Sequence, residues 1–153
     1  MDISICPAEL GDVEDIFTIR TSVQENHMSR AELEQIGITP RALMQMLSPR
    51  MADEPAIWIA RMEGQAVGFS MVEQEDACLF ALFVAPQCEG RGVGRALLER
   101  AEAALFQHHP RIWLETAVSS RACGFYRHLG WCISAHLDGD DVRMEKTGPR
   151  PAA

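Results

Sequence analysis

A glycine-rich turn with two arginines is the part of the sequence best suited to chemistry. It spans residues 89–95 (EGRGVGR), between an apolar run and an amphipathic segment that predicts a helix. Glycines let the backbone turn tightly and approach a ligand, and the free amides at a helix start point at one place. Together with the Arg91 and Arg95 side chains, these amides predict a site for a phosphate or pyrophosphate.

The glycine spacing matches neither of the common nucleotide-binding patterns. A P-loop requires a lysine after its last glycine, and Arg95 follows Gly94 here. In the dinucleotide pattern G-x-G-x-x-G, the third glycine would be Arg95 counted from Gly90, or Leu97 counted from Gly92. A nucleotide-binding protein is therefore disfavoured. The alternative to a phosphate site is an ordinary loop whose glycines bind no ligand.

The flanking segments predict the elements that position this turn. The apolar run at 79–84 (LFALFV), ended by Pro86, predicts a buried central strand, and residues 92–107 predict the helix after the turn. Helix signals are Asp12 as an N-cap, a Ser29–Glu32 capping box, Pro40 at a first position and Gly130 after a last one. Further strands are predicted at 3–5, 57–60, 65–72, 111–116, 131–136 and 142–146, and a late helix at 119–129. The order favours an α/β (α+β) fold, a mixed sheet with helices on both faces.

Composition limits the classes of function. The chain has 153 residues and a net charge of −8, which argues against nucleic-acid binding because phosphates require a basic surface. No apolar run approaches the roughly 20 residues of a membrane span, and the first residues lack a signal-peptide pattern. The five cysteines form no C-x-x-C pair, so we expect reduced thiols, no metal site and a cytoplasmic location. We expect one domain over residues 1–147 and a flexible tail at 148–153.

Two stretches resemble the GNAT superfamily of N-acetyltransferases. One is the strand, proline and GRGVGRALL sequence ending at Leu98; the other combines residues 112–116 (IWLET) with 125–131 (FYRHLGW). Glu89 stands where the family usually has Gln or Arg, and Ser119 where it often has Asn. The resemblance implies a mixed, mostly antiparallel sheet of about six to seven strands with a splayed central strand pair.

The resemblance also implies acetyl-CoA as the cosubstrate. It would lie where the strands at 79–84 and 111–116 splay apart, with unpaired backbone groups of Leu82 and Val84 binding the peptide-like pantetheine arm. The glycine turn would hold the pyrophosphate. The residues implied at the cofactor are Leu82, Phe83, Val84, Glu89, Gly90, Arg91, Gly92, Val93, Gly94, Arg95, Ala96, Ser119 and Tyr126.

Tyr126, the sole tyrosine, stands where the family has a residue that hydrogen-bonds or protonates the departing thiolate. Full proton transfer from a phenol of pKa near 10 to a thiolate of pKa near 8.5 is uphill by about 2 kcal/mol, which favours hydrogen bonding. An acceptor amine must also lose a proton, so a general base is expected. Glu115 is the first choice; Glu73, Glu25 and His27 remain alternatives.

The function implied is acetyl transfer to a primary amine, on a small molecule or a protein, directly within a ternary complex. The residues predicted to line the acceptor site are Glu25, Asn26, His27, Trp58 and Phe80. A non-catalytic acyl-CoA sensor on the same fold is the alternative, although it would not need Tyr126. The resemblance is also compatible with a homodimer, for which the sequence locates no interface.

Overall fold

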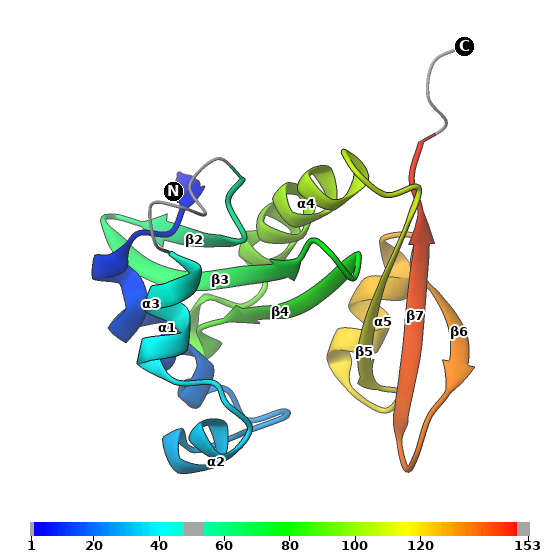
Figure 1. Cartoon of the computed structure of the whole chain (residues 1–153), viewed down its shortest axis with the longest axis horizontal. Helices are drawn as coiled ribbons and strands as arrows, with labels where there is room; N and C mark the ends of the chain where they lie inside the picture. Colours follow the sequence, from blue (N-terminus) through cyan, green and yellow to red (C-terminus); the bar gives the residue numbers. More distant parts are fainter. Residues whose placement is uncertain (1, 48–53, 150–153) are drawn as a thin grey trace. The chain divides into compact units, whose positions relative to one another are not determined.

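A computed structural model describes residues 2–47 and 54–149. These residues form seven strands and five α-helices, and the 3-10 turns η1 (Leu10–Asp12) and η3 (Pro86–Cys88) precede α1 and α4 (Figure 1). The strands are β1 (Ile3–Pro7), β2 (Ile57–Met62), β3 (Gln65–Glu73), β4 (Cys78–Val84), β5 (Arg111–Ala117), β6 (Cys132–His136) and β7 (Asp141–Thr147). The helices are α1 (Val13–Ser22), α2 (Arg30–Gln35), α3 (Pro40–Met46), α4 (Val93–Phe106) and α5 (Arg121–His128).

The strands form a seven-stranded sheet in the order β1-β2-β3-β4-β5-β7-β6. The β1–β2, β2–β3, β5–β7 and β6–β7 pairs are antiparallel, whereas β4 and β5 are parallel. The hairpin between β2 and β3 turns on Glu63 and Gly64, both with positive φ, as the twist of antiparallel strands favours. The predicted fold class, a mixed and mostly antiparallel sheet with helices, is confirmed.

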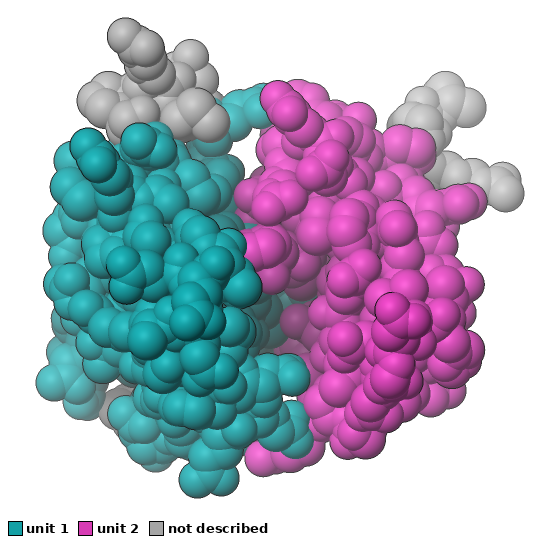
Figure 2. All heavy atoms as spheres, turned by 60° about the horizontal axis from the view of Figure 1, so that its bottom comes forward, with its two compact units in different colours: residues 1–71, 81–101 teal, residues 72–80, 102–153 magenta. Residues whose placement is uncertain are grey.

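The chain divides into two compact units (Figure 2). The first holds residues 1–71 and 81–101, and the second holds 72–80 and 102–153. The division passes through β3, β4 and α4, so three elements run from one unit into the other.

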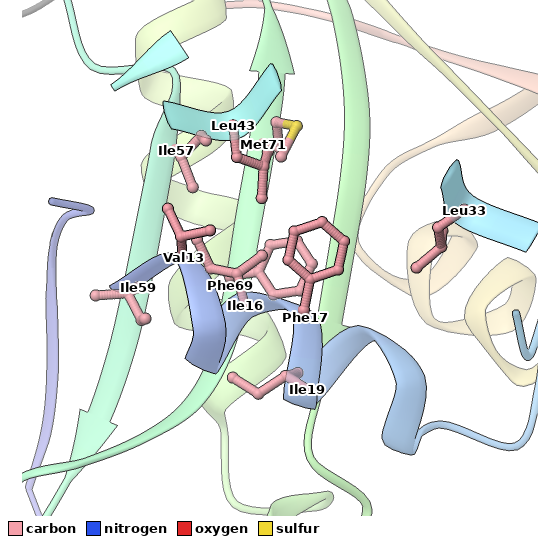
Figure 3. Close-up of a cluster of buried hydrophobic side chains, with 10 residues drawn as sticks. All are labelled: Val13, Ile16, Phe17, Ile19, Leu33, Leu43, Ile57, Ile59, Phe69 and Met71. Carbon is pink, nitrogen blue, oxygen red and sulfur yellow. The ribbon is translucent and has the colours of Figure 1, made fainter. Parts of the chain in front are cut away.

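The first unit has helices on both faces of its strands. Ile59 of β2 and Phe69 of β3 are register partners, and they pack into an apolar cluster with α1 and α3 (Figure 3). The alternate residues of β3 face α4, because the Ser70 hydroxyl donates to the carbonyl of Leu97 and a Cβ on Gly68 would lie 2.9 Å from Leu97 Cδ1. The alternation of side chains along β3 therefore separates the two helical layers.

The second unit has one buried sheet face. Leu114 of β5 and Met144 of β7 are register partners and both are buried, while α5 contacts β5. Cys123 and Tyr126 of α5 are buried as well. The opposite face carries Trp113, Glu115 and Arg143, which are half-buried or exposed.

The cap predictions have mixed outcomes. The Ser29–Glu32 capping box forms, and Gly130 has φ +100° after α5, as predicted. Asp12 occupies the N-cap position of α1, but its side chain does not cap: it accepts from the Glu9 amide and pairs with Arg61 of β2. The predicted N-cap position is confirmed, but the buried carboxylate is stabilised by a charged partner in place of a helix amide. Among the described residues, no helix is long and apolar enough to cross a membrane.

Candidate functional site

The glycine turn lies in the first unit and leads β4 into α4. Gly90 and Gly92 have φ of +78° and +86°, and a Cβ on either would meet nothing within 4 Å. These glycines are therefore required by the left-handed backbone and not by crowding. The Ala96 amide bonds the carbonyl of Gly92, so the helical hydrogen bonds of α4 begin there. The amides of Val93, Gly94 and Arg95 precede that bond and have no partner within the helix.

The side chains around this turn divide into inward and outward groups. Val93 is fully buried, and a Cβ on Gly68 of β3 would lie 3.1 Å from its Cγ1. Glu89, Arg91 and Arg95 are exposed, and the Arg95 guanidinium bonds Glu99 one turn along α4 at 3.2 Å. The turn thus presents amides and cationic side chains outward while Val93 anchors it to the core.

The predicted cofactor strand, β4, is half-buried over Leu82, Phe83 and Val84. The Phe83 ring packs against Phe69 at 5.7 Å, so its side chain belongs to the core face. The parallel register of β4 with β5 pairs Cys78 with Trp113. Residues 82–84 lie beyond that pair along β4.

Arg20 connects the predicted acceptor segment to β4 within the first unit. Its guanidinium lies 4.2 Å from the Phe83 ring centroid and donates to the carbonyl of Asn26 at 3.1 Å. Burial lowers the pKa of Arg20 from its usual value. Asn26 itself has φ +56°, and Nδ1 of His27 bonds the Val23 carbonyl at 3.0 Å. Arg20 therefore ties the loop after α1 to the strand predicted to bind the cofactor.

Sequence analysis did not single out Arg20. It follows Ile16 by four residues and Phe17 by three, which places a cation on the apolar stripe of α1. A charged residue among the apolar positions of a helix is the sequence pattern that could have identified Arg20. Arg143, whose guanidinium lies 4.0 Å from the Trp113 ring centroid, was also missed, and only the β5–β7 register reveals it.

Trp58 lies apart from the other predicted acceptor residues of the first unit. It is 3% exposed and is the register partner of Ser70, whose hydroxyl bonds α4. Trp58 is thus on the α4 face of the strands, whereas α1 packs on the opposite face. The structure does not bring Trp58 together with residues 25–27.

Tyr126 lies in the second unit, near the end of α5. Its ring is 5.4 Å from Phe125 and 5.8 Å from Trp131, centroid to centroid, and the residue is 6% exposed. Burial raises the pKa of the phenol above its usual value. The phenol is therefore held in its neutral form, which can donate a hydrogen bond.

Glu115 and Glu73, two of the candidate bases, also lie in the second unit. Glu115 is exposed on β5, opposite Arg143 of β7 in the register. Burial, followed by a hydrogen bond and the charge of Asp76, raises the pKa of Glu73. Both carboxylates help raise the pKa of the Cys78 thiol to about 12, although burial is the larger cause. Phe80, two residues along β4, is 45% exposed.

Ser119 does not cap the late helix. Ser120 is the N-cap of α5, and its hydroxyl accepts from the Cys123 amide. The Ser119 hydroxyl donates instead to the Asp140 carboxylate in the turn before β7. The predicted helix start is wrong by two residues and the N-cap by one, because the bond to Asp140 holds Ser119 outside the helix.

The predicted site residues are thus divided between the units. Residues 25–27, 82–84 and 89–96 lie in the first unit, and Phe80, Glu115, Ser119 and Tyr126 lie in the second. Among the described residues, no group of three or more His, Cys, Asp or Glu side chains could hold a metal ion.

The sequence matches the model of a known protein family. The model for the acetyltransferase (GNAT) domain matches residues 53–133, more than half of the chain. The chain belongs to the GNAT acetyltransferase family. The match includes β4, the glycine turn, β5 and α5, and so spans both units of this GNAT chain.

Solved structures share the GNAT fold at low sequence identity. The PaiA N-acetyltransferase of Thermoplasma acidophilum, in complex with coenzyme A, is 19% identical with a TM-score of 0.80, covering 97% of this chain and all of that one. The ribosomal-protein-S18-alanine N-acetyltransferase of Escherichia coli is 19% identical with a TM-score of 0.72, covering 99% and 97%. YncA of Salmonella typhimurium, with its cofactor acetyl-CoA, is 16% identical with a TM-score of 0.74, covering 99% and 96%. No curated protein matches the chain.

Proposed function

We propose that this GNAT chain is an acetyl-CoA-dependent N-acetyltransferase that transfers acetyl directly to a primary amine in a ternary complex. The glycine turn carries the proposal. Gly90 and Gly92 lead the backbone into the start of α4, where the amides of residues 93–95 and the exposed Arg91 and Arg95 can meet a pyrophosphate. The solved structures with coenzyme A and acetyl-CoA have the same fold, which supports this choice of cosubstrate.

The backbone of β4 is the proposed partner of the pantetheine arm. Leu82 and Val84 follow Cys78, the register partner of Trp113, along β4. An extended amide-containing ligand satisfies backbone groups of such a strand as an added strand would. The packing of Phe83 on Phe69 would hold β4 still while its main chain binds.

The reaction forms a bond between the amine nitrogen and the acetyl carbon and breaks the bond from that carbon to sulfur. The amine proton passes to a base, for which we propose Glu115, with Glu73 as the alternative. The raised pKa of Glu73 makes that carboxylate the stronger base. The departing thiolate accepts a hydrogen bond from Tyr126, whose raised pKa keeps the phenol neutral and disfavours complete proton transfer.

The remaining assignments are proposals of the same kind. Residues 1–147 would form one acetyltransferase domain, which the family match across both units supports. A cytoplasmic location agrees with five free cysteines. The acceptor is a primary amine of a small molecule or a protein; one structural relative carries a ribosomal protein in its name. A homodimer would be detected by light scattering of the purified chain.

Thermal unfolding with acetyl-CoA, coenzyme A, ATP and NADH tests the cosubstrate. A ligand at 100 times its dissociation constant adds about 2.7 kcal/mol, which raises the midpoint by roughly 5–10 °C for a domain of this size. We expect a rise with acetyl-CoA and coenzyme A. A rise with ATP or NADH alone would overturn the proposal.

A panel of amines, with release of the coenzyme A thiol as readout, then tests catalysis. Tyr126→Phe should lower kcat about 10- to 100-fold with little change in cofactor affinity, because the hydrogen bond forms as the thiolate departs. Arg91→Glu should weaken coenzyme A binding. Arg41→Glu, the same change at an exposed position of α3, should not. Binding without turnover of any amine would favour the acyl-CoA sensor instead.

A further inference from the structure

A polar cluster in the second unit joins α4 to the turn that follows α5. Glu102, on the last turns of α4, accepts from the Trp131 indole N–H at 3.0 Å and from the Lys146 ammonium at 2.8 Å. Lys146 of β7 also donates to the carbonyl of Leu129 at 2.9 Å. The Glu102 and Lys146 side chains are 14% and 25% exposed, and Trp131 is 2% exposed. We call Glu102 and Lys146 the clip.

The clip holds both ends of a three-residue turn. Leu129 and Trp131 are its end residues, and Gly130 between them has φ +100°. A Cβ on Gly130 would lie 3.4 Å from Lys146 Cε, so Lys146 packs directly against the turn. The amide of Gly130 also bonds the carbonyl of Arg127 at 3.2 Å, so the backbone of the turn is joined to the end of α5. The two charged side chains add contacts that join this turn to α4 and β7.

The 129–131 turn contacts Tyr126 through its backbone and through the Trp131 ring. The amides of Leu129 and Trp131 both bond the Tyr126 carbonyl at 3.0 Å, and the Trp131 ring packs on the Tyr126 ring. These backbone and ring contacts set the direction in which the phenol points.

We propose that Glu102 is a positioning residue for Tyr126, acting through Lys146 and the turn at 129–131. The proposal rests on the proposed function, in which the Tyr126 hydroxyl meets the leaving sulfur. Glu102 touches neither substrate nor cofactor. Its effect is to hold the phenol in one orientation before the thiolate forms, so that little reorganisation is needed during the reaction.

The variants Glu102→Gln and Lys146→Met remove the clip one charge at a time. We expect each to lower kcat by about tenfold while KM for acetyl-CoA stays within twofold, because misplacement of a group that acts at the transition state reduces kcat. Glu14→Gln is the matched control. Glu14 also pairs with a cation, Arg30, but both side chains are exposed, and we expect wild-type kinetics.

The single tyrosine supplies a readout that needs no turnover. Protein labelled with [13C]tyrosine gives one ring signal, that of Tyr126. In Glu102→Gln and Lys146→Met, we expect this signal to move from its wild-type position in the free protein, and the shift caused by coenzyme A to fall by at least half. Glu14→Gln should retain both values.

The double variant Glu102→Gln/Lys146→Met separates positioning from stability. Removal of both charges relieves the penalty of one charge left unpaired, so its thermal midpoint should exceed that of the less stable single variant. Its kcat should stay low, because the turn still lacks the clip. If kcat returns together with stability, or if the tyrosine signal is unchanged in all variants, the positioning role is overturned.

Failure of the proposed function gives a different result. A wild-type protein that neither binds coenzyme A nor releases thiol would refute the acetyltransferase proposal, and with it the catalytic purpose of the clip. A moved tyrosine signal in the ligand-free variants would still establish that Glu102 sets the ring orientation. An unmoved signal with normal coenzyme A binding would refute the clip alone.

Discussion

Tyr126 is the residue whose ionisation depends most directly on its surroundings. Burial raises its pKa above the value of about 10 that an exposed phenol has. The folded chain should therefore show little tyrosinate absorbance near pH 10, whereas the chain in urea should be half ionised there. Because the unfolded state loses this proton first, the free energy of unfolding should fall as the pH rises above about 10.

Absorbance titration of the native and the urea-unfolded protein measures this directly, since the chain has one tyrosine. Tyr126→Phe is the control: it should abolish the tyrosinate signal in both states. A native titration that coincides with the unfolded one would contradict the buried placement of the ring.

Cys78 should be an inert thiol. Burial first, and then nearby carboxylates, raise its pKa from 9.0 to about 12, so the reactive thiolate is scarce at neutral pH. Mass spectrometry after brief iodoacetamide treatment should find Cys6 and Cys132, which are exposed, modified well before Cys78. In urea the difference should disappear. Modification of native Cys78 at the rate of Cys132 would refute this prediction.

At the scale of single residues, the sequence predicted what local spacing determines. The left-handed Gly130 followed from its place after a helical segment. The contact of Arg20 with Phe83, and that of Lys146 with Glu102, join residues far apart in the chain, and only the fold brings them together. Asp12 illustrates the same limit, since its partner Arg61 lies 49 residues away.

At the scale of elements, β3 approaches α4 so closely at Gly68 that a side chain there would meet its neighbours. A Cβ on Gly68 would lie 2.9 Å from Leu97 Cδ1 and 3.0 Å from the Phe83 carbonyl oxygen. Gly68→Ala should therefore lower the free energy of unfolding by about 1–3 kcal/mol, because a backbone oxygen cannot move aside cheaply. Gly124→Ala, exposed inside α5 with nothing within 4 Å, should instead raise it by about 0.5–1 kcal/mol.

Urea unfolding of both variants and the wild type gives the comparison. A Gly68→Ala variant as stable as the wild type would refute the close approach of α4 to β3. A larger loss for Gly68→Ala, with the m-value unchanged, supports it.

The elements themselves were largely predictable, because hydrophobic period and turn residues act locally. The apolar run of β4 and the amphipathic run of α4 were found within a residue or two of their bounds. The start of α5 was misplaced because Ser119 and Ser120 are chemically identical candidates. Only the bond of Ser119 to Asp140, 21 residues later, distinguishes them.

For the whole molecule, we predict that the two units unfold together. Three elements run through the division, so neither unit can lose its strands without breaking elements of the other. Trp58 lies in the first unit, and Trp113 and Trp131 lie in the second. In the Trp58→Phe variant, the remaining tryptophans report on the second unit. In the Trp113→Phe/Trp131→Phe variant, Trp58 reports on the first unit.

Each variant should show a fluorescence midpoint equal to its own midpoint by far-ultraviolet circular dichroism, as two-state unfolding requires. Separated midpoints within either variant would show that the units are independent, and would contradict the proposal of one domain over residues 1–147.

The two exposed cysteines stand on the two edge strands of the sheet, Cys6 on β1 and Cys132 on β6. One belongs to each unit. With the half-buried Cys88 replaced by alanine, these native thiols can carry a pair of nitroxide spin labels without any added cysteine. Pulsed electron paramagnetic resonance would then measure the distance between the two labels. A comparison with and without an acyl thioester would show whether binding changes the distance between the two edge strands.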